Sequence, residues 1–366
     1  MQENILLPLA MEDKMGYVDR SGKVIIEPQY CFTCNFSEGL ARVRLGETWG
    51  YIDETGKFIV PLQDFDWVHD FAEGLARVRI KEKSGYNKYG YIDKSGEFII
   101  QPKFYDARDF SEGLAVVMVE GQKFYYINKS GEMAFALKFQ YACNFSEGLA
   151  AVEIDNLWGY INRTGEIVIQ PQFNWGRNFS EGIAAVRIDE NLGYIDRFGE
   201  LVIPPQFKEA GNFVEGLAPV KVGNRWGYID KTGKIVIKPQ FGKAHNFAEE
   251  LAAVRKYNLW GYIKKNGELA IPLQYNEVED FTLGIARVNL DFNWGYINKI
   301  GKTIANEQLL KEHPLQFLPF VLLARLGKVG NKIFYKIGLI QLLLFLILFP
   351  CLYIMLPLKN QLKNRT

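Results

Sequence analysis

The 366-residue sequence contains few of the residues that most often carry chemistry, with 4 cysteines and 3 histidines. Four cysteines are too few for a disulfide framework, so we expect reduced thiols in a cytosolic compartment. The sequence also lacks a dominant charge, because 43 basic residues are balanced by 42 acidic residues to give a net charge of +1. This balance argues against the strongly basic surface of a nucleic-acid-binding protein.

Signals for secretion and catalysis are also missing. Residues 1–14 have no basic region followed by a long apolar run, so the sequence predicts no secretory signal and a cytoplasmic location for the residues that follow. It contains no phosphate-binding glycine loop and no Gly-x-Ser-x-Gly nucleophile motif. We therefore predict no catalytic, cofactor-binding or metal-binding residue, no enzyme activity and no small-molecule substrate.

What the chain does contain is a tandem repeat of about 34 residues, present about nine times. Eight copies are complete and the ninth ends soon after Gly301. The clearest copies read Trp-Gly-Tyr-Ile and begin at Trp158, Trp226, Trp260 and Trp294. The repeated glycine is found at Gly16, Gly50, Gly90, Gly159, Gly193, Gly227, Gly261 and Gly295.

Each copy is predicted to form three short strands. The first alternates aliphatic and charged residues, as in residues 40–45, which is typical of a strand with one polar face. The second is the Trp-Gly-Tyr-Ile-Asp segment. It is joined to the third by an Asp-x-Ser/Thr-Gly turn such as Asp230–Gly233, where the Asx side chain binds the turn backbone and glycine adopts a left-handed conformation. The third strand is continuously apolar, as in residues 235–237, and ends at a proline such as Pro239.

The connection to the next copy carries the pattern Asn/Asp-Phe-x-Glu-Gly. Its Asn and Glu have the spacing of a capping box, so the sequence predicts a single helical turn closed by glycine. Glu250 replaces this glycine in one copy, and Leu283 replaces the glutamate in another. A left-handed backbone at Glu250 would cost about 1 kcal/mol relative to glycine.

The apolar third strands predict that each sheet is covered by neighbours on both faces. The predicted fold is therefore an all-β tandem repeat over residues 1–310, in which three-stranded β-meanders stack as a propeller-like or solenoid array. Both a closed ring and an open array satisfy this pattern.

The string Trp-Gly-Tyr-Ile-Asp-x-x-Gly, followed by Phe-x-Glu-Gly-Leu-Ala-x-Val, resembles the bacterial WG-repeat family from about Pro8 to Ala305. This resemblance implies a β-rich array with a role in binding other molecules, and it implies no catalytic residues. The sequence departs from the pattern at Met15, Tyr89, Phe124 and Leu192 in the Trp column, at Tyr125 in the Gly column, and at Glu250 and Leu283 in the connection.

The C-terminal part differs in composition from the repeats. Residues 337–358 are free of charged side chains, and about 20 such residues are enough to cross a bilayer as an α-helix. We predict a linker or interfacial helix over residues 311–336, a transmembrane helix over 337–358 and a short basic tail over 359–366. A buried cap on the last repeat is the alternative for the apolar segment.

A few side chains are candidates for a site. Cys34, His69, Cys143 and His245 share one repeat column, which is a conceivable metal site if the array closes. Trp67 and Trp175 lie outside the Trp-Gly column and are candidates for a binding surface, with burial under the connection as the alternative. First-strand positions expected to meet a partner include Arg42, Arg44, Arg77 and Arg79.

The sequence as a whole predicts a non-catalytic interaction scaffold that is tethered to a membrane by a single C-terminal span, has its repeats in the cytoplasm and binds an unknown protein partner. Two alternatives remain open at this point. One is an enzyme or metal-dependent module that uses the Cys34/His69/Cys143/His245 column. The other is a surface-exposed module that binds cell wall or glycan.

Overall fold

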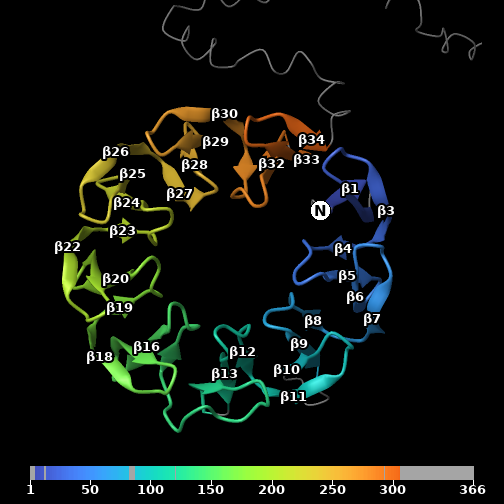
Figure 1. The fold of residues 1–366 in the computed structure, drawn as a ribbon, viewed down its shortest axis with the longest axis horizontal. Coiled ribbons are helices and arrows are strands. Elements are labelled where there is room, and N and C mark those ends of the chain that lie inside the picture. Colours follow the sequence, from blue (N-terminus) through green and yellow to red (C-terminus); the bar gives the residue numbers. More distant parts are fainter. Residues whose placement is uncertain (1–4, 12–13, 82–86, 120, 292, 306–366) are drawn as a thin grey trace, which may run out of the picture. The chain divides into compact units, whose positions relative to one another are not determined.

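The computed structural model describes residues 5–11, 14–81, 87–119, 121–291 and 293–305. These residues form antiparallel β-sheets arranged as nine blades of a β-propeller around a central opening (Figure 1). Blade 1 contains β1–β3, blade 2 β4–β7, blade 3 β8–β11, blade 4 β12–β14, blade 5 β15–β18, blade 6 β19–β22, blade 7 β23–β26, blade 8 β27–β30 and blade 9 β31–β34.

Within a blade the chain runs from the centre of the ring to its periphery. The innermost strands are β4 (Phe32–Thr33), β8 (Trp67–Val68), β12 (Asp106–Ala107), β15 (Tyr141–Ala142), β19 (Trp175–Gly176), β23 (Glu209–Ala210), β27 (Lys243–Ala248) and β31 (Glu277–Val278). The next strands are β1 (Leu7–Met11), β5 (Ala41–Leu45), β9 (Ala76–Lys81), β13 (Ala115–Val119), β16 (Leu149–Ile154), β20 (Ile183–Ile188), β24 (Ala218–Val222), β28 (Leu251–Lys256) and β32 (Ile285–Leu290).

The strands of the Trp-Gly motif and the outer strands complete the blades. The motif strands are β2 (Lys14–Val18), β6 (Thr48–Ile52), β10 (Asn87–Ile92), β14 (Lys123–Ile127), β17 (Leu157–Asn162), β21 (Asn191–Asp196), β25 (Arg225–Ile229), β29 (Leu259–Lys264) and β33 (Asn293–Asn298). The outer strands are β3 (Val24–Tyr30), β7 (Phe58–Gln63), β11 (Phe98–Phe104), β18 (Ile167–Phe173), β22 (Leu201–Phe207), β26 (Ile235–Phe241), β30 (Leu269–Tyr275) and β34 (Thr303–Ala305). In blade 4 two isolated bridges, Phe124 to Phe139 and Ile127 to Met133, take the place of an outer strand.

The turn between the motif strand and the outer strand is the predicted Asx turn. Asp230 Oδ1 accepts hydrogen bonds from the amides of Thr232 and Lys234 at 2.9 and 3.1 Å, and Gly233 has a φ of 82°. These hydrogen bonds, above all the one from the Thr232 hydroxyl at 2.6 Å, lower the pKa of Asp230. The turn is thus fixed by residues within one repeat, which is why the sequence predicts it.

The glycine of the Trp-Gly motif is required by a β-bulge. In blade 5, Trp158 pairs with Phe173 but Tyr160 pairs with Ile169, so the outer strand bulges opposite Gly159. A Cβ atom on Gly159 would lie 2.5 Å from the carbonyl oxygen of Ile169 and 2.8 Å from the nitrogen of Pro171. Only a residue without a side chain fits there.

The connection forms a strand and a tight turn, so the prediction of a helical turn is wrong. Its first part is the short innermost strand of the next blade, which gives most blades four strands instead of the predicted three. Ser37 and Leu40 then exchange backbone hydrogen bonds around Glu38 and Gly39, whose φ angles are 51° and 82°. Two successive left-handed residues make a type I′ turn, which suits the twist of a hairpin. Glu250 stands at the glycine position and has a φ of 73°. This is the left-handed conformation for which we expected a cost of about 1 kcal/mol relative to glycine.

The outer strands are less buried than their apolar sequence predicted. In β18 the exposed fractions of Ile167, Val168 and Ile169 are 38%, 46% and 2%, so only the third residue enters the core. The sheets are indeed packed between neighbouring blades, but the outer strand also forms the rim of the ring, where apolar residues remain in contact with solvent.

Each blade is joined to the next by the tyrosine of the Trp-Gly-Tyr motif. The Tyr160 hydroxyl donates a 2.8 Å hydrogen bond to the carbonyl oxygen of Arg177 in blade 6, and its ring packs 4.9 Å from Phe179. Burial raises the pKa of this phenol, which remains a neutral donor. The same bond is made by Tyr17, Tyr51, Tyr91, Tyr126, Tyr194, Tyr228 and Tyr262.

The ring is closed by contacts between blade 9 and blade 1. Tyr296 donates a 2.8 Å hydrogen bond to the carbonyl oxygen of Pro8, although the two residues are 288 positions apart. Leu7, Leu9, Val18, Ile285 and Tyr296 form one buried cluster at this seam. These contacts decide between the two arrangements that the sequence left open, in favour of a closed propeller.

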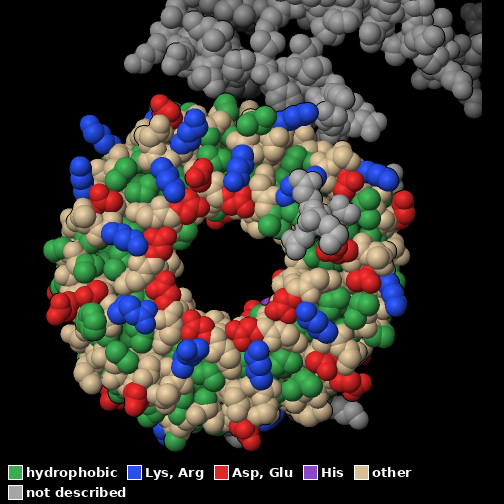
Figure 2. Space-filling model, viewed as in Figure 1, with side chains coloured by type: hydrophobic (Ala, Val, Ile, Leu, Met, Phe, Trp, Pro, Cys, Tyr) green, Lys and Arg blue, Asp and Glu red, His purple; other side chains and the backbone are tan. Residues whose placement is uncertain are grey.

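The glutamate of the connection also crosses to the next blade. Glu38 accepts a 3.0 Å hydrogen bond from the amide of Gly74 and lies 3.3 Å from the ammonium of Lys94, both in blade 3. Figure 2 shows acidic side chains around the opening with basic side chains beside them. The seven ion pairs of this belt are Glu38–Lys94, Glu73–Lys129, Glu112–Arg163, Glu147–Arg197, Glu181–Lys231, Glu215–Lys265 and Glu249–Lys299.

At the closing seam Leu283 replaces this glutamate, and Arg20 donates to its carbonyl oxygen instead. The predicted domain end at residue 310, the linker, the transmembrane helix and the basic tail all lie outside the described residues. Among the residues that the structure describes, no helix is long and apolar enough to span a membrane.

Candidate functional site

In the column of Cys34, His69, Cys143 and His245, the first three residues directly follow the innermost strand of blades 2, 3 and 5, and His245 lies within β27 of blade 8. His69 contacts Arg77, with 3.1 Å between His69 Nδ1 and Arg77 Nη2, whereas His245 Nδ1 lies 2.9 Å from Asp280 Oδ1. Burial, with Arg77 and Arg42 nearby, lowers the pKa of His69 to about 3. Within the described part of the chain, no group of three or more His, Cys, Asp or Glu side chains is placed to hold a metal ion.

The neighbouring Asn/Asp column shows how the centre of the ring is filled in blades 2–4. Arg42 Nε lies 2.9 Å from Asp70 Oδ1 in the next blade, and its side chain is only 14% exposed. Its Nη1 also donates to the carbonyl oxygen of Val68 at 2.5 Å. Arg77 and Asp109 repeat this arrangement between blades 3 and 4, with an Nε–Oδ1 distance of 2.8 Å. A buried guanidinium therefore occupies each of these two junctions and neutralises the aspartate.

The same two positions carry smaller and neutral residues in blades 5–7. Ala151 and Ala185 stand where blades 2 and 3 have Arg42 and Arg77, since each pairs with the motif tyrosine across its sheet. The following column is Asn144, Asn178 and Asn212. The Oδ1 atoms of these three asparagines are buried and have no hydrogen-bond donor among the described residues. A buried acceptor without a donor costs about 1–3 kcal/mol. In blades 2–4, Arg42 Nε, Arg77 Nε and Asp109 Oδ1 likewise have no aligned hydrogen bond, but there the groups are charged and form ion pairs.

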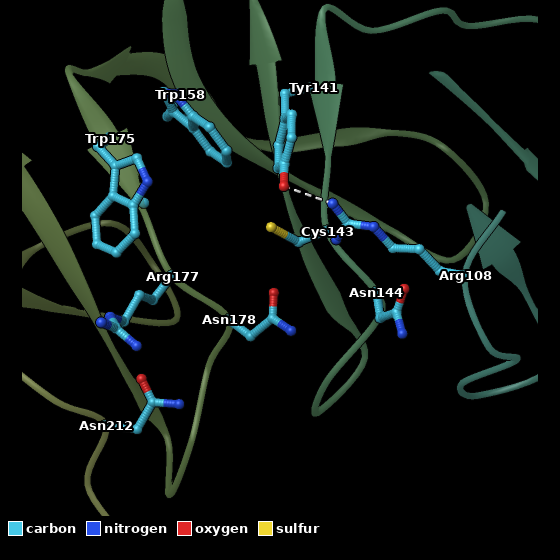
Figure 3. Close-up of a pocket in the computed structure, with 10 residues that line it drawn as sticks. Arg108, Tyr141, Cys143, Asn144, Trp158, Trp175, Arg177, Asn178 and Asn212 are labelled. Carbon is cyan, nitrogen blue, oxygen red and sulfur yellow. Dashed lines mark hydrogen bonds between the residues drawn. The ribbon is translucent and has the colours of Figure 1, made fainter. Parts of the chain in front are cut away.

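An open cavity of about 330 Å³ lies at this place. Figure 3 shows aromatic side chains on one side of it and asparagines on the other, with a guanidinium on each flank. The lining residues come from blades 4 to 7 and are Arg108, Tyr141, Cys143, Asn144, Trp158, Trp175, Gly176, Arg177, Asn178 and Asn212. We refer to this set as the asparagine pocket.

The aromatic side of the asparagine pocket is built from two blades. The ring of Trp158, from the Trp-Gly motif of blade 5, lies 5.4 Å from Tyr141 and 6.5 Å from Trp175 on β19 of blade 6. Gly176 follows Trp175 where other innermost strands have Thr, Val or Ala. A Cβ atom at Gly176 would lie 2.9 Å from the Tyr160 hydroxyl and 3.8 Å from Trp158 Cβ, so glycine at this position lets Tyr160 and Trp158 pack closely against the backbone of β19.

Two arginines flank the aromatic side. Arg108 donates a 2.6 Å hydrogen bond to the Tyr141 hydroxyl, and its guanidinium lies 5.0 Å from the centre of the Tyr141 ring. The guanidinium of Arg177 lies 5.2 Å from the ring centre of Trp175. No carboxylate belongs to the lining residues, so the pocket is locally cationic although the chain is nearly neutral.

The only thiol in the lining, Cys143, is a poor nucleophile. Burial raises its pKa, and the nearby Arg108 and Arg177 reduce this effect without reversing it. Because the thiolate is the reactive form, the environment of Cys143 does not favour covalent catalysis. The arrangement of cations, rings and amides is suited to holding a ligand.

The structure distinguishes between the residues that the sequence proposed as a site. Trp175 lines the pocket, whereas Trp67 packs 5.1 Å from Trp49 in a filled cluster of blades 2 and 3. Arg79 pairs with Asp66 at 2.5 Å, so it joins Arg42 and Arg77 in contacts within the ring. Arg44 lies 5.7 Å from the Trp49 ring centre. Sequence reasoning missed the asparagines and Gly176, which are visible only as departures between aligned copies.

Comparison with known proteins agrees with the repeat analysis. The sequence model of the family described as WG containing repeat matches residues 15–49, 49–83, 89–122, 126–158, 158–191, 193–226, 226–260 and 260–291. No curated protein matches the chain.

The comparison with solved structures finds matches at low sequence identity. One described as the eukaryotic initiation factor has a TM-score of 0.60 at 12% identity, over 83% of this chain and 95% of that chain. BamB from Moraxella catarrhalis has a TM-score of 0.43 at 9% identity, over 79% of this chain and 95% of that chain. At 12% identity the likeness to the initiation factor shows the fold alone.

Proposed function

We propose, from the premise that the chain belongs to the WG-containing repeat family, that it is a non-catalytic scaffold that binds a protein partner at a membrane. The observation that carries this proposal is the asparagine pocket, an open, cationic and aromatic cavity with buried asparagine oxygens that lack donors. The apolar residues 337–358 support a membrane tether. We place the propeller in the cytoplasm as part of the proposal.

The chemistry of the pocket supports binding over catalysis. A hydrolytic or transfer reaction needs an activated nucleophile or a general acid and base within reach of one another. The lining offers a thiol with a raised pKa and no carboxylate or histidine. The blades of the closed ring are joined by buried tyrosines. This rigid frame holds the side chains of the asparagine pocket in fixed positions for binding.

Site-specific photo-crosslinking in cells that express the full chain tests the partner. The crosslinking amino acid replaces Leu157, which is 39% exposed and adjoins Trp158, or, as a control, the exposed Asn293 at the equivalent position of blade 9. We expect a defined protein adduct from position 157 and none from position 293. Equal adducts from both positions, or none from either, would contradict a protein-binding role for this pocket.

Fractionation tests the tether independently. The full chain is expected in the membrane fraction after carbonate washing, and a chain that lacks residues 337–358 in the soluble fraction. Protease added to intact cells should leave the repeats uncut if they lie in the cytoplasm. Release of the full chain by carbonate contradicts the anchor, and rapid loss of the repeats contradicts the cytoplasmic placement.

A further inference from the structure

We propose that the asparagine pocket binds an extended peptide segment in which an acidic side chain lies next to an aromatic one. This inference rests on the proposed function and deepens it, because it names the chemistry of the partner at that site. It is carried by three independent features of the pocket: its charge, its rings and its row of amides.

The charge of the pocket favours an anionic ligand. Arg108 and Arg177 line the pocket, and the lining contains no carboxylate. Among the described residues, no ion pair or side-chain hydrogen bond involves the Arg177 guanidinium, which rests on the Trp175 ring. By contrast, Arg42 and Arg77 at the filled junctions each have an aspartate at 2.9 and 2.8 Å. A ligand carboxylate would form an ion pair with Arg177, as Asp70 and Asp109 of the protein do with Arg42 and Arg77.

The rings define what accompanies the anion. Tyr141, Trp158 and Trp175 form a continuous series with centroid distances of 5.4 and 6.5 Å. Gly176 adds no side chain to this series, and Tyr160 packs closely against its backbone. A planar apolar group fits such a site, because aromatic rings prefer offset or edge-to-face contact at these distances. An acidic side chain followed by an aromatic one supplies both groups within one short segment.

The amides indicate a peptide backbone. Asn144, Asn178 and Asn212 occur once per blade in three successive blades and all line the pocket. Each carboxamide offers one acceptor and two donors, and this set matches the N–H and C=O groups of a peptide unit. In an extended segment such groups recur on the same side at every second residue, which suits a row of equivalent amides. Their Oδ1 atoms are shielded from solvent, so a peptide N–H reaches these acceptors when the amide side chains turn toward the pocket.

A neutral glycan fits this combination less well. Sugars stack on aromatic rings and bind amides, but they leave both guanidiniums without a counter-charge. The charge of the lining therefore favours the acidic peptide, and a glycan becomes one outcome of the test.

The test uses the full chain in detergent micelles and four fluorescent probes. The first is an eight-residue peptide of alternating Asp and Phe, the second has Lys in place of Asp, and the third has Ser in place of Phe. The fourth is a chitin oligosaccharide. Fluorescence anisotropy gives a dissociation constant for each probe at low and high salt.

Two variants provide the matched control. Gly176→Val adds a side chain against Tyr160 and Trp158 at the edge of the pocket, so these rings must shift. The same column carries Val68 and Val278 beside the equivalent tyrosines Tyr51 and Tyr262, so the fold accommodates valine there. Ala244→Val makes a comparable change in blade 8, outside the pocket. Circular dichroism and thermal unfolding confirm that both variants are folded.

We expect the Asp-Phe peptide to bind at least tenfold more tightly than the Lys-Phe or Asp-Ser peptide, a difference of about 1.4 kcal/mol. Its affinity should fall at least tenfold in Gly176→Val, remain unchanged in Ala244→Val and decrease with salt. Binding that Gly176→Val leaves unchanged overturns the inference, because the peptide then binds elsewhere. Binding of the oligosaccharide alone, or of no probe, also overturns it.

These failures are distinguishable from failure of the proposed function. A specific protein adduct at position 157 together with no peptide binding leaves the scaffold in place and removes only the acidic-aromatic peptide. Loss of the adduct and of peptide binding together removes both.

Discussion

The junctions between adjacent blades are packed differently in blades 2–4 and in blades 5–7. In the first region Arg42 and Arg77 reach into the next blade and neutralise Asp70 and Asp109. In the second, alanines stand at the arginine positions, and the asparagine oxygens beyond them have no donor. The first arrangement pairs its charges within the protein, and the second presents neutral side chains at a pocket. The backbone of the repeat is the same in both regions, and replacement of the arginine and aspartate by alanine and asparagine distinguishes the region that carries the pocket.

The largest effect on stability is expected from removing the buried arginine at the junction of blades 2 and 3. Arg42→Ala removes an ion pair with Asp70 and a hydrogen bond to Val68, and it leaves a half-buried carboxylate unpaired. We expect a loss of about 2–3 kcal/mol in the free energy of unfolding, measured by denaturant titration of the full chain.

The double variant Arg42→Ala/Asp70→Asn copies the pattern of blades 5 and 6. It should recover at least half of that loss, because an amide is cheaper than a carboxylate to leave without a partner. If the double variant is no more stable than Arg42→Ala, Arg42 does not stabilise the protein by neutralising Asp70.

Local features of this fold are visible in the sequence, and features made between blades are not. The Asx turn at Asp230 and the bulge at Gly159 depend on residues within one copy, so the repeat pattern predicts them. The Glu38 side chain has the spacing of a capping box, but its hydrogen bond goes to Gly74 in the next blade. Closure is equally non-local, since Tyr296 meets Pro8 across almost the whole array.

The pocket could have been predicted only in part. Trp175 stands out because it is an extra tryptophan, whereas Asn144, Asn178 and Asn212 share a column with the aspartates of blades 3 and 4 and do not stand out. Aligning the copies shows Arg42 with Asp70 but Ala151 with Asn178, a correlation between adjacent copies. That correlation becomes meaningful only when the structure shows that the two columns meet across a junction.

The glutamate belt is common to both regions and should therefore contribute equally to each. Glu73 in blade 3 accepts a hydrogen bond from Gly113 and lies 3.2 Å from Lys129, and Glu181 in blade 6 makes the same contacts with Gly216 and Lys231. We expect Glu73→Ala and Glu181→Ala to cost about 1–2 kcal/mol each. Denaturant midpoints that differ strongly between the two variants would show that the frame itself differs between the regions.

Acid should destabilise the filled region through His69. The folded protein holds this imidazole neutral, with its pKa lowered to about 3 by burial and by Arg77 and Arg42, whereas the unfolded chain binds a proton near pH 6.5. The stability that His69 contributes is therefore present above pH 6.5 and is lost as the pH falls toward 3. After allowance for its partial exposure, we expect a loss of about 1 kcal/mol between pH 6.5 and 5.

The variants for this prediction come from the same column. His69→Cys, with a residue found there at Cys34 and Cys143, should flatten the pH dependence of the thermal midpoint. His245→Cys in blade 8 serves as the control, because His245 contacts the carboxylate of Asp280, whereas His69 contacts the guanidinium of Arg77. An unchanged slope in His69→Cys would remove His69 as the cause.

The smallest effect on stability, and the largest effect on ligand binding, is expected from introducing an arginine–aspartate pair at the junction of blades 5 and 6. Ala151→Arg/Asn178→Asp transfers the pair of blades 2 and 3 to blades 5 and 6, where Tyr160 and Gly176 present the same backbone frame. The new guanidinium has a cavity to occupy and a carboxylate to neutralise, so the free energy of unfolding should change by less than about 1 kcal/mol. Peptide binding and the crosslink from position 157 should nevertheless be lost, because the arginine fills the asparagine pocket and supplies its own counter-charge. If the variant is stable and still binds, the empty junction is not the site, and the difference between the two regions has no functional meaning.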